Sequence, residues 1–365
     1  MMNRLSALSA FLAAALLFWM GCASQEQPPA RVSDQANFTR QVNVPPNSKI
    51  VEIIHYNGNV NVIGWDRNDI LMEGIKRASS NSVQETRGIL DFITIDAYER
   101  GTDRLVLEYN GPSTFLGIGR NDTGIDATIH VPRTMAVDLQ CRYGDVQVSD
   151  MNANVAVDHR QGDVKLEHID GRVQVRSQGR TIILRDISRS LRIDGRDANV
   201  NVDGVKGDAS IQHSGGEVVV ARVDGKLVLN TSKSNLTLNE NRGRIELDNR
   251  EGDVMCNGFY EGLQAYVKGG TLNAQPQTPV AQSYYCSVDN GDLILRVPDS
   301  SSMLVDITAE QGRIQSDFNL PVSTQNTLST ARGAVNGGEH NVQLNVRKGS
   351  VSLFKAAASA IPSAS

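Results

Sequence analysis

The sequence predicts an all-β fold, a β-solenoid of the parallel β-helix kind, in which short strands coil around one core. Three observations predict it. From Met135 onward a nine-residue unit recurs sixteen times without an insertion, the third and fifth residues of every unit are apolar, and glycine begins nine of the units. Side chains two apart on a strand point to the same face, so each apolar pair marks the inner side of a short strand. Only 40% of all residues are hydrophobic, so an unbroken series of thirty-two apolar positions is not a chance result.

The predicted core is the set of these paired positions. It consists of Val137, Leu139, Val146, Val148, Val155, Val157, Val164, Leu166, Val173, Val175, Ile182, Leu184, Leu191, Ile193, Val200, Val202, Ala209, Ile211, Val218, Val220, Leu227, Leu229, Leu236, Leu238, Ile245, Leu247, Val254, Cys256, Leu263, Ala265, Leu272 and Ala274. The glycine that begins a unit supplies the positive φ or the close backbone approach that a corner requires.

A second period of eighteen residues lies on the first. In alternate units the eighth residue is apolar, as in Met151, Ile169, Ile187, Val205 and Val223. In the other units it is polar, and these residues are Arg142, Arg160, Gln178, Arg196, Ser214, Ser232, Arg250 and Lys268. The pattern predicts coils of about eighteen residues with two strand faces, one buried corner and one exposed corner, stacked about 4.8 Å apart.

The N-terminus predicts export. Arg4 precedes an apolar run from Leu5 to Met20, and Gly21-Cys22 ends the predicted signal peptide of residues 1–22. Gly21-Cys22 resembles the lipobox of bacterial lipoproteins, which implies lipidation of Cys22 and a membrane anchor. Because Ala23 is not the aspartate that retains lipoproteins in the inner membrane, the resemblance implies an outer-membrane or periplasm-facing protein. Trp19 and Met20 depart from the usual lipobox residues, and the alternative is ordinary cleavage near Ala23 with loss of Cys22.

The flanks of the regular repeat are predicted to cap it. Residues 23–41 read as a flexible tether and residues 42–134 as an N-terminal β segment with strands near 50–56, 59–64, 69–76, 88–98 and 104–109. The regular solenoid spans 135–275, and a break with Pro276 and Pro279 follows. Residues 286–355 read as a C-terminal β segment, and the Ala/Ser-rich residues 356–365 as a disordered tail.

The sequence offers few candidate sites. The basic residues of the exposed corner, Arg142, Arg160, Arg196, Arg250 and Lys268, form a row that could bind an anionic glycan or lipid head group. The alternative is solvated ion pairs, because Asp145, Asp163, Asn199, Asp253 and Thr271 follow them at the same corner. No Cys/His cluster has metal-ligand spacing, so no metal is expected, and His159 and His213 are expected at the surface. A net charge of −5 gives no basic excess that would suggest nucleic acid, and no cofactor is expected.

The four cysteines leave one pairing open. Export permits disulfides, and Cys256 with Cys286 is the pair to consider. The alternative is that Cys141 and Cys256 serve as small apolar residues on inward strand positions.

Three segments carry a family resemblance: GNVNVIGWD at 58–66, IHVPRTMAVDL followed by GDVQV at 129–148, and GDLILRVP at 291–298. They resemble the bacterial adhesin family with β-strand repeats, a domain of unknown function related to an auto-transporter adhesin head domain. The resemblance covers roughly residues 45–355. It implies the solenoid architecture and offers no catalytic residues to carry over.

These observations predict a non-enzymatic envelope lipoprotein, whose solenoid is a binding or scaffolding surface for an envelope glycan or protein. The alternative is a polysaccharide lyase or hydrolase, since such enzymes also use β-helices. Those enzymes build clefts from long loops, and the break from Gln275 to Tyr285 is the one place in the repeat region that offers a loop.

Overall fold

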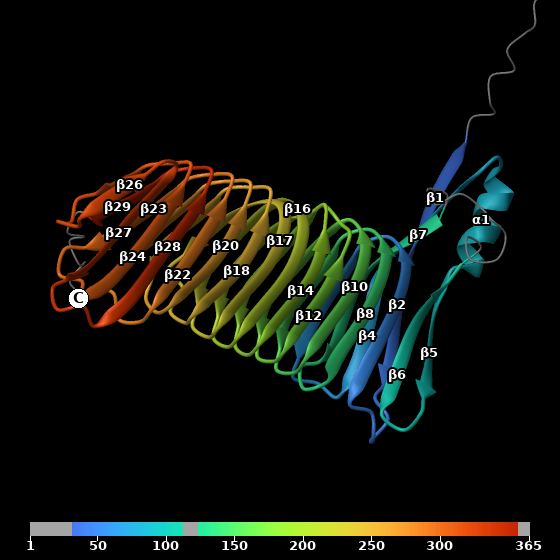
Figure 1. The fold of residues 1–365 in the computed structure, drawn as a ribbon. Coiled ribbons are helices and arrows are strands. Elements are labelled where there is room, and N and C mark those ends of the chain that lie inside the picture. Colours follow the sequence, from blue (N-terminus) through green and yellow to red (C-terminus); the bar gives the residue numbers. More distant parts are fainter. Residues whose placement is uncertain (1–30, 112–122, 357–365) are drawn as a thin grey trace, which may run out of the picture.

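The computed structural model describes residues 31–111 and 123–356, and these form a long rod of stacked β-coils (Figure 1). The predicted signal peptide with Cys22, residues 23–30 of the predicted tether and the tail after residue 356 lie outside the described residues. Within the described ranges the chain has one helix and twenty-nine strands. The predicted β-solenoid is confirmed.

Two strand faces run along the rod, which we call face A and face B. Face A contains β8 (Ala136–Tyr143), β10 (Val155–Gln161), β12 (Val173–Ser177), β14 (Leu191–Arg196), the first parts of β16 (Ala209–Val223) and β17 (Leu227–Asn239), β18 (Ile245–Arg250) and β20 (Leu263–Lys268). Face B contains β9 (Val146–Met151), β11 (Asp163–Ile169), β13 (Thr181–Ile187), β15 (Asn199–Val205), the second parts of β16 and β17, β19 (Val254–Phe259) and β21 (Leu272–Pro276). Each strand pairs in parallel with the strand eighteen residues away, as Val155 does with Val173 and Val164 with Ile182.

The core is the predicted row. All thirty-two predicted positions are buried, and none is more than 3% exposed. The parallel ladders between coils satisfy the backbone, and the inward residues of the two faces meet in a single cluster. A single coil would leave both its edges and its apolar side chains open, so the stack is stable only as a whole.

The glycines that begin the units serve mainly for close approach. A Cβ on Gly243 would lie 2.1 Å from the carbonyl oxygen of Gly225, and one on Gly270 would lie 2.2 Å from that of Gly252. Neither residue has a positive φ. At these corners the backbones of adjacent coils therefore stack too closely for a side chain.

The two corners differ in how they turn. At the corner after face B, a column of residues with positive φ includes Asp150, His168, Asp186, Arg222 and Glu240, eighteen residues apart or a multiple of it. This left-handed residue reverses the strand alternation, so the next residue points inward. It explains the predicted burial of Met151, Ile169, Ile187, Val205 and Val223, all at most 1% exposed.

The corner after face A is not simply exposed, and here the prediction was wrong in part. The basic and polar eighth residues are half-buried or exposed as predicted, but the alternation continues, and the seventh residue points inward. This seventh position forms a buried column of His55, Cys141, His159, Ser177, Gly195, His213, Thr231, Asn249, Val267, Val288 and Val346.

At the N-terminal end the coils are stacked out of chain order. The elements here are β1 (Val32–Asn43), β2 (Ile50–Asn57), β3 (Val60–Trp65), β4 (Asp69–Ser80), α1 (Val83–Phe92), β5 (Thr94–Arg100), β6 (Arg104–Asn110) and β7 (Thr123–Pro132). Val51 pairs with Val137 on one side and Leu105 on the other, and Val60 pairs likewise with Val146 and Ala127. The β2–β3 coil therefore lies between the β6–β7 coil and the β8–β9 coil.

Two expectations for this end are corrected. The predicted tether ends earlier, because residues 32–43 form β1, which pairs antiparallel with β4 along its length. This pairing covers an edge of β4 that would otherwise be open. The predicted strand at 88–98 begins instead within α1, whose N-cap Ser82 accepts a hydrogen bond from the Glu85 backbone N–H. The spacing of Thr86, Ile89 and Leu90, all buried, is helical.

At the C-terminal end, too, the coils are stacked out of chain order. Its strands are β22 (Tyr284–Asp289), β23 (Leu293–Pro298), β24 (Met303–Glu310), β25 (Ile314–Ser316), β26 (Val322–Gln325), β27 (Leu328–Val335), β28 (His340–Arg347) and β29 (Val351–Ala356). The β28–β29 coil lies between the β22–β23 coil and the β24–β25 coil. The antiparallel β26–β27 hairpin then extends the sheet beyond β24.

The solenoid is thus longer than predicted. It has two coils at the N-terminal end, eight coils of eighteen residues and three at the C-terminal end, thirteen in all. At the predicted break Leu263 pairs with Tyr284, so that coil is three residues longer and the stack continues through it. The predicted boundaries at 135 and 275 mark where the eighteen-residue spacing stops, and the coils continue past both. Thirteen levels give a stack about 60 Å long.

Candidate functional site

The predicted basic row follows the corner at the ends of the face A strands, but it is not uniform. Arg142 and Arg160 lie in adjacent coils near the N-terminal end. Arg250 lies 3.7 Å from Asp248, and Lys268 pairs in register with Asp289, a residue that Arg347 also contacts. The structure therefore brings Arg142 and Arg160 together and leaves Arg196, Arg250 and Lys268 separate from them.

Arg142 and Arg160 line a hollow, which we call the corner hollow. Its residues come from β6, β2, β8 and β10, four successive levels of face A. They are Ile54, His55, Tyr56, Glu108, Tyr109, Asn110, Gln140, Cys141, Arg142, Asp158 and Arg160. The backbone positions of these residues are set by four strands paired in register.

One half-buried aromatic ring, that of Tyr56, borders the corner hollow, and the neighbouring Tyr109 is buried at 4% exposure. The rings of Tyr56 and Tyr109 are stacked, with centroids 6.4 Å apart and planes 9° from parallel. Tyr143 meets Tyr56 edge-on at 5.8 Å, and the Arg142 guanidinium lies 5.1 Å from the centroid of Tyr56. A half-buried tyrosine beside two arginines combines an apolar ring with donors of charge-assisted hydrogen bonds. The sequence prediction found the arginines and missed Tyr56 and Tyr109, because these two tyrosines occur in coils outside the eighteen-residue spacing.

The charges of the corner hollow are mixed. Glu108 and Asp158 stand beside the two arginines, and the Tyr98 hydroxyl donates a hydrogen bond to Glu108 at 2.6 Å. Burial raises the pKa of the Cys141 thiol to about 12, so the thiol is protonated at neutral pH and is not an activated nucleophile. The arrangement is suited to binding a polar ligand.

The histidines expected at the surface are buried in the column at the seventh position, so that expectation was wrong. His159 is 1% exposed, with its Nε2 2.8 Å from the Gly144 carbonyl oxygen and its Nδ1 3.2 Å from Ser177 Oγ. His213 is 5% exposed, and its ring occupies the space that Gly195 leaves without a side chain. Burial lowers the pKa of both rings and lowers that of His55 to about 4. All three imidazoles are neutral at pH 7.

The acidic and amide residues that follow the basic row have a structural role. Asp145 Oδ1 accepts the backbone N–H of Asp163 at 2.9 Å, and Asn235 Oδ1 accepts that of Asp253 at 3.0 Å. In the same way, Asn199 Oδ1 and Asp253 Oδ1 accept the backbone N–H groups of Glu217 and Thr271 in the next coil. These side chains therefore join adjacent coils at the corner and do not mainly neutralise the arginines. We call this column the corner ladder.

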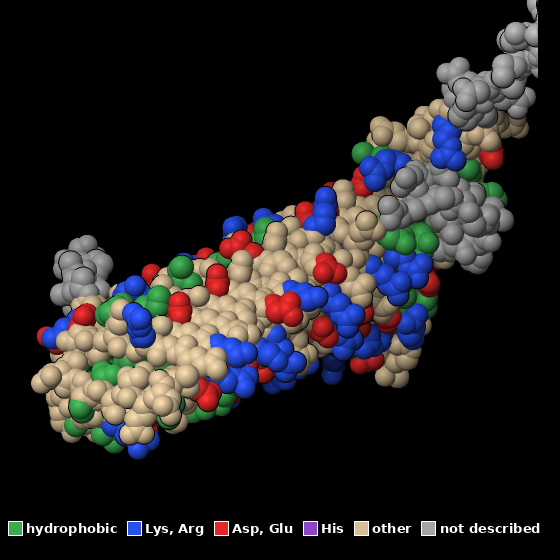
Figure 2. Space-filling view, turned by 45° about the horizontal axis from the view of Figure 1, so that its top comes forward, with side chains coloured by type: hydrophobic (Ala, Val, Ile, Leu, Met, Phe, Trp, Pro, Cys, Tyr) green, Lys and Arg blue, Asp and Glu red, His purple; other side chains and the backbone are tan. Residues whose placement is uncertain are grey.

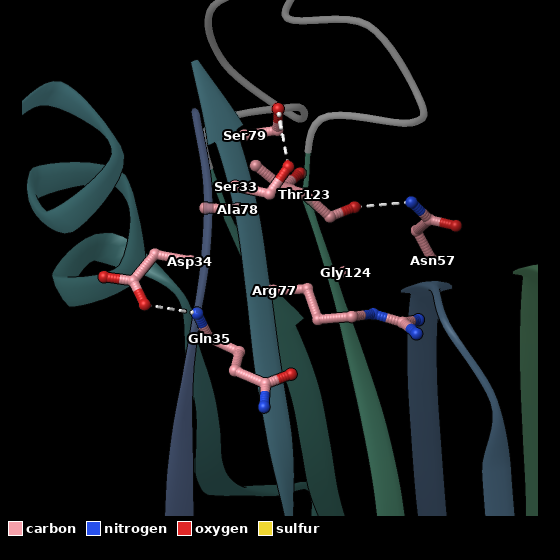
Figure 3. Close-up of a pocket in the computed structure, with 9 residues that line it drawn as sticks. All are labelled: Ser33, Asp34, Gln35, Asn57, Arg77, Ala78, Ser79, Thr123 and Gly124. Atoms are coloured by element: carbon pink, nitrogen blue, oxygen red, sulfur yellow. Dashed lines mark hydrogen bonds between the residues drawn. The ribbon is translucent and has the colours of Figure 1, made fainter. Parts of the chain in front are cut away.

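A second hollow lies at the N-terminal end of the rod, between β1, β4 and β7 (Figure 3). The Gln35 and Arg77 side chains lie across it, and the Ser33 and Ser79 hydroxyls are 3.3 Å apart. Arg77 forms an ion pair with Asp126 at 2.7 Å. Its charge is thereby neutralised within the protein, so this hollow is a weaker candidate for an anionic ligand.

Other site classes find no support in the described residues. Across residues 31–111 and 123–356 no group of three or more His, Cys, Asp or Glu side chains is arranged to hold a metal ion. No helix in these ranges is long and apolar enough to cross a membrane. Cys141, Cys256 and Cys286 are free and buried, so the disulfide considered between Cys256 and Cys286 is not formed.

Comparison with known proteins finds similar solved structures. The chain is similar to the solved structure of a "putative cell adhesion protein" from Clostridium sporogenes, with 11% identity, a TM-score of 0.21 and coverage of 88% of this chain and 100% of that one. A "putative adhesin" from Bacteroides fragilis shows 12% identity, a TM-score of 0.27 and coverage of 88% and 97%. No curated protein matches the chain.

The family assignment comes from the sequence itself. Residues 111–353 match the Toastrack DUF4097 family, a domain of unknown function. The matched range includes all sixteen nine-residue units and the coils at the C-terminal end. Because the match covers well over half of the chain, the protein belongs to the Toastrack DUF4097 family.

Proposed function

We propose that this protein is a non-enzymatic, adhesin-like component of the cell envelope that binds a polar, anionic glycan in the corner hollow. The observation that carries the proposal is the half-buried ring of Tyr56 beside Arg142 and Arg160, on adjacent stacked strands of the solenoid. Stacking and charge-assisted hydrogen bonds together are the chemistry by which acidic sugars are held.

The environment of the hollow supports binding without catalysis. An acid–base mechanism requires two titratable groups set apart in pKa and aimed at one bond. In the hollow the Cys141 thiol and the His55 imidazole are both buried and held neutral by their surroundings. Glu108 already accepts a hydrogen bond from Tyr98.

The proposed envelope location rests on Cys22. If it is lipidated, the nine residues from 23 to 31 join the anchor to β1. An extended chain of that length spans about 30 Å, so the N-terminal end of the rod stays close to the membrane. The corner hollow lies at this end, which favours a ligand belonging to the envelope itself.

The anchor is tested by Cys22→Ser. We expect the variant to leave the membrane fraction and to lose labelling by a fatty-acid analogue, with the unmodified chain as reference. A wild-type chain that takes up no label would contradict the anchor and leave the binding proposal to be judged separately.

The binding proposal is tested by calorimetry with acidic oligosaccharides prepared from envelope extracts. We expect Tyr56→Ala and Arg142→Ala each to weaken binding about tenfold or more, while the matched control Arg250→Ala leaves it unchanged. Equal losses in all three variants would contradict a specific site. A measurable cleavage rate on these oligosaccharides, abolished by Glu108→Gln, would favour the lyase or hydrolase alternative.

A further inference from the structure

A groove runs along face A, separate from the corner hollow. It lies between the column of second residues and the column of fourth residues in five successive coils, from β10 to β17. The second residues are Asn154, Arg172, Ser190, Asp208 and Lys226, and the fourth residues are Ala156, Gln174, Arg192, Ser210 and Val228. Five coils at about 4.8 Å make the groove about 19 Å long, parallel to the rod axis. We call it the basic groove.

Three cationic side chains, Arg172, Arg192 and Lys226, line the basic groove, and they differ in whether a carboxylate lies close enough to form an ion pair. Across residues 31–111 and 123–356, neither Arg172 nor Arg192 has a carboxylate within 4.0 Å of its guanidinium group. Lys226 contacts Glu246 at 2.7 Å, and that carboxylate also contacts Arg244. Figure 2 shows Lys and Arg side chains gathered over the N-terminal half of the visible side, interspersed with Asp and Glu.

The one acidic residue in the groove is already engaged. Asp208 Oδ1 accepts the backbone N–H of Lys226 at 2.9 Å, a bond of the same kind as those of the corner ladder. Small side chains, Ala156 and Ser210, leave room above the strands between the cations. The groove therefore offers an open track with exposed guanidinium groups on both sides.

We propose that the basic groove binds a linear anionic polysaccharide, extended along the rod with its repeat in step with the coils. One coil rises by about 4.8 Å, and a sugar unit in an extended chain has a similar length. Arg172 and Arg192 lie in adjacent coils on opposite sides of the groove, so they contact successive units of one chain. This proposal adds a second site to the proposed function. The basic groove and the corner hollow share only the class of ligand.

Nucleic acid is a poorer occupant for this groove. No aromatic side chain lines it, and base stacking on aromatic rings is the main sequence-independent contact to single strands. Duplexes need a broad basic face, whereas the three cations here lie along one narrow groove.

The experiment uses oligogalacturonates of increasing length as the probe, titrated into the whole folded chain at low salt. We expect the affinity to rise with length until the oligomer spans five coils and then to level off. Changing Arg172, Arg192 and Lys226 together to glutamine should weaken binding of the long oligomer about tenfold or more and abolish the dependence on length. The matched control changes Arg185, Arg222 and Arg242 to glutamine, which removes the same charge from elsewhere on the rod.

The outcomes separate the two sites. Tyr56→Ala should leave the length dependence intact, because Tyr56 belongs to the corner hollow. A loss of binding in Tyr56→Ala alone would place the long oligomer in the corner hollow and overturn the groove. An equal loss in the control triple variant, or tighter binding of single-stranded DNA of equal charge, would also overturn it. Circular dichroism of each variant confirms that the coils are intact.

Discussion

At the scale of the residue, a difference of one position along a strand decides whether a side chain faces the core or the solvent. Val202 is buried between Leu184 and Val220 of the adjacent coils, and its neighbour Asn201 is exposed on the same strand. Because side chains alternate along a strand, a shift of one residue would exchange the two environments.

This alternation gives a matched test. We expect Val202→Asp to lower the free energy of unfolding by about 3 kcal/mol or more, because it buries a carboxylate without a partner. Asn201→Asp should change it by less than about 0.5 kcal/mol. The measurement is denaturant unfolding of both variants beside the parent. A larger effect at Asn201 would mean that the inward row is wrongly assigned.

The corner glycines allow a second test at this scale. Gly270→Ala places a Cβ 2.2 Å from the Gly252 carbonyl oxygen, so the coils must separate, and we expect a loss of about 1–3 kcal/mol. The control is Gly88→Ala in α1, where a Cβ would meet nothing within 4 Å. That change should stabilise the helix by about 0.5–1 kcal/mol. Similar effects of the two substitutions on unfolding would argue against close stacking at the corner.

At the scale of the element, the coils are joined by more than strand ladders. In the corner ladder, Asp145, Asn199, Asn235 and Asp253 each accept a backbone N–H of the next coil. The buried column at the seventh position adds neutral histidines, and Thr231 donates to Asn249 at 2.7 Å within it.

The corner ladder predicts that the acceptor oxygen matters more than the charge. Asp145→Ala should lower the free energy of unfolding by about 0.5–1.5 kcal/mol, because the Asp163 N–H loses its acceptor. Asp145→Asn keeps an oxygen at the same place and should cost less. If the asparagine variant were as destabilised as the alanine variant, Asp145 would act through its ion pairs instead.

The buried histidines predict a dependence on pH. The unfolded His55 has a pKa near 6.5 and the folded one about 4, so between these values the unfolded chain binds the proton that the native state excludes. The free energy of unfolding is therefore highest above pH 6.5 and falls as the pH is lowered toward 4. The slope due to His55 approaches about 1.4 kcal/mol per pH unit.

This dependence is measured by urea unfolding at pH 7, 6, 5 and 4.5. His159 and His213 add to it, since burial lowers the pKa of both. The free energy of unfolding of His55→Leu should fall less steeply with decreasing pH than that of the parent chain, whatever its value at pH 7. Parallel curves for the two chains would contradict a buried, neutral His55.

At the scale of the whole molecule, both ends of the rod are closed by coils inserted out of chain order. The β2–β3 coil separates β6–β7 from β8–β9, and the β28–β29 coil separates β22–β23 from β24–β25. Antiparallel strands then lie beyond the outermost coils at both ends. The terminal coils thus cannot leave the stack one after another along the chain.

Engineered disulfides test this order. With the native cysteines replaced by alanine, Ile54→Cys with Gln140→Cys should form a disulfide readily, because the two residues are parallel neighbours in β2 and β8. Their Cα atoms lie about 4.8 Å apart, within the range that a disulfide spans. Glu108→Cys with Gln140→Cys should not crosslink, because β2 lies between them. The reverse result, read by non-reducing gel, would mean that β6 and β8 are adjacent.

The periodic sequence pattern alone predicts the solenoid, its eighteen-residue coil and the thirty-two paired inward positions from Val137 to Ala274, because each strand must bury an apolar pair. It does not predict the buried column at the seventh position, whose members are mostly polar. It also predicted the burial of the residues that follow the left-handed corner, such as Met151. It did not predict that Val51 and Val137 are neighbours 86 residues apart, or that Tyr284 and Val342 pair across 58 residues. Those pairings depend on which coil covers each open edge. The repeat spacing fails in both flanking segments, so it cannot predict which coils are adjacent there. The corner hollow depends on the tertiary structure for the same reason. Tyr56 comes from the inserted β2–β3 coil, and only the stacking order places it beside Arg142 and Arg160.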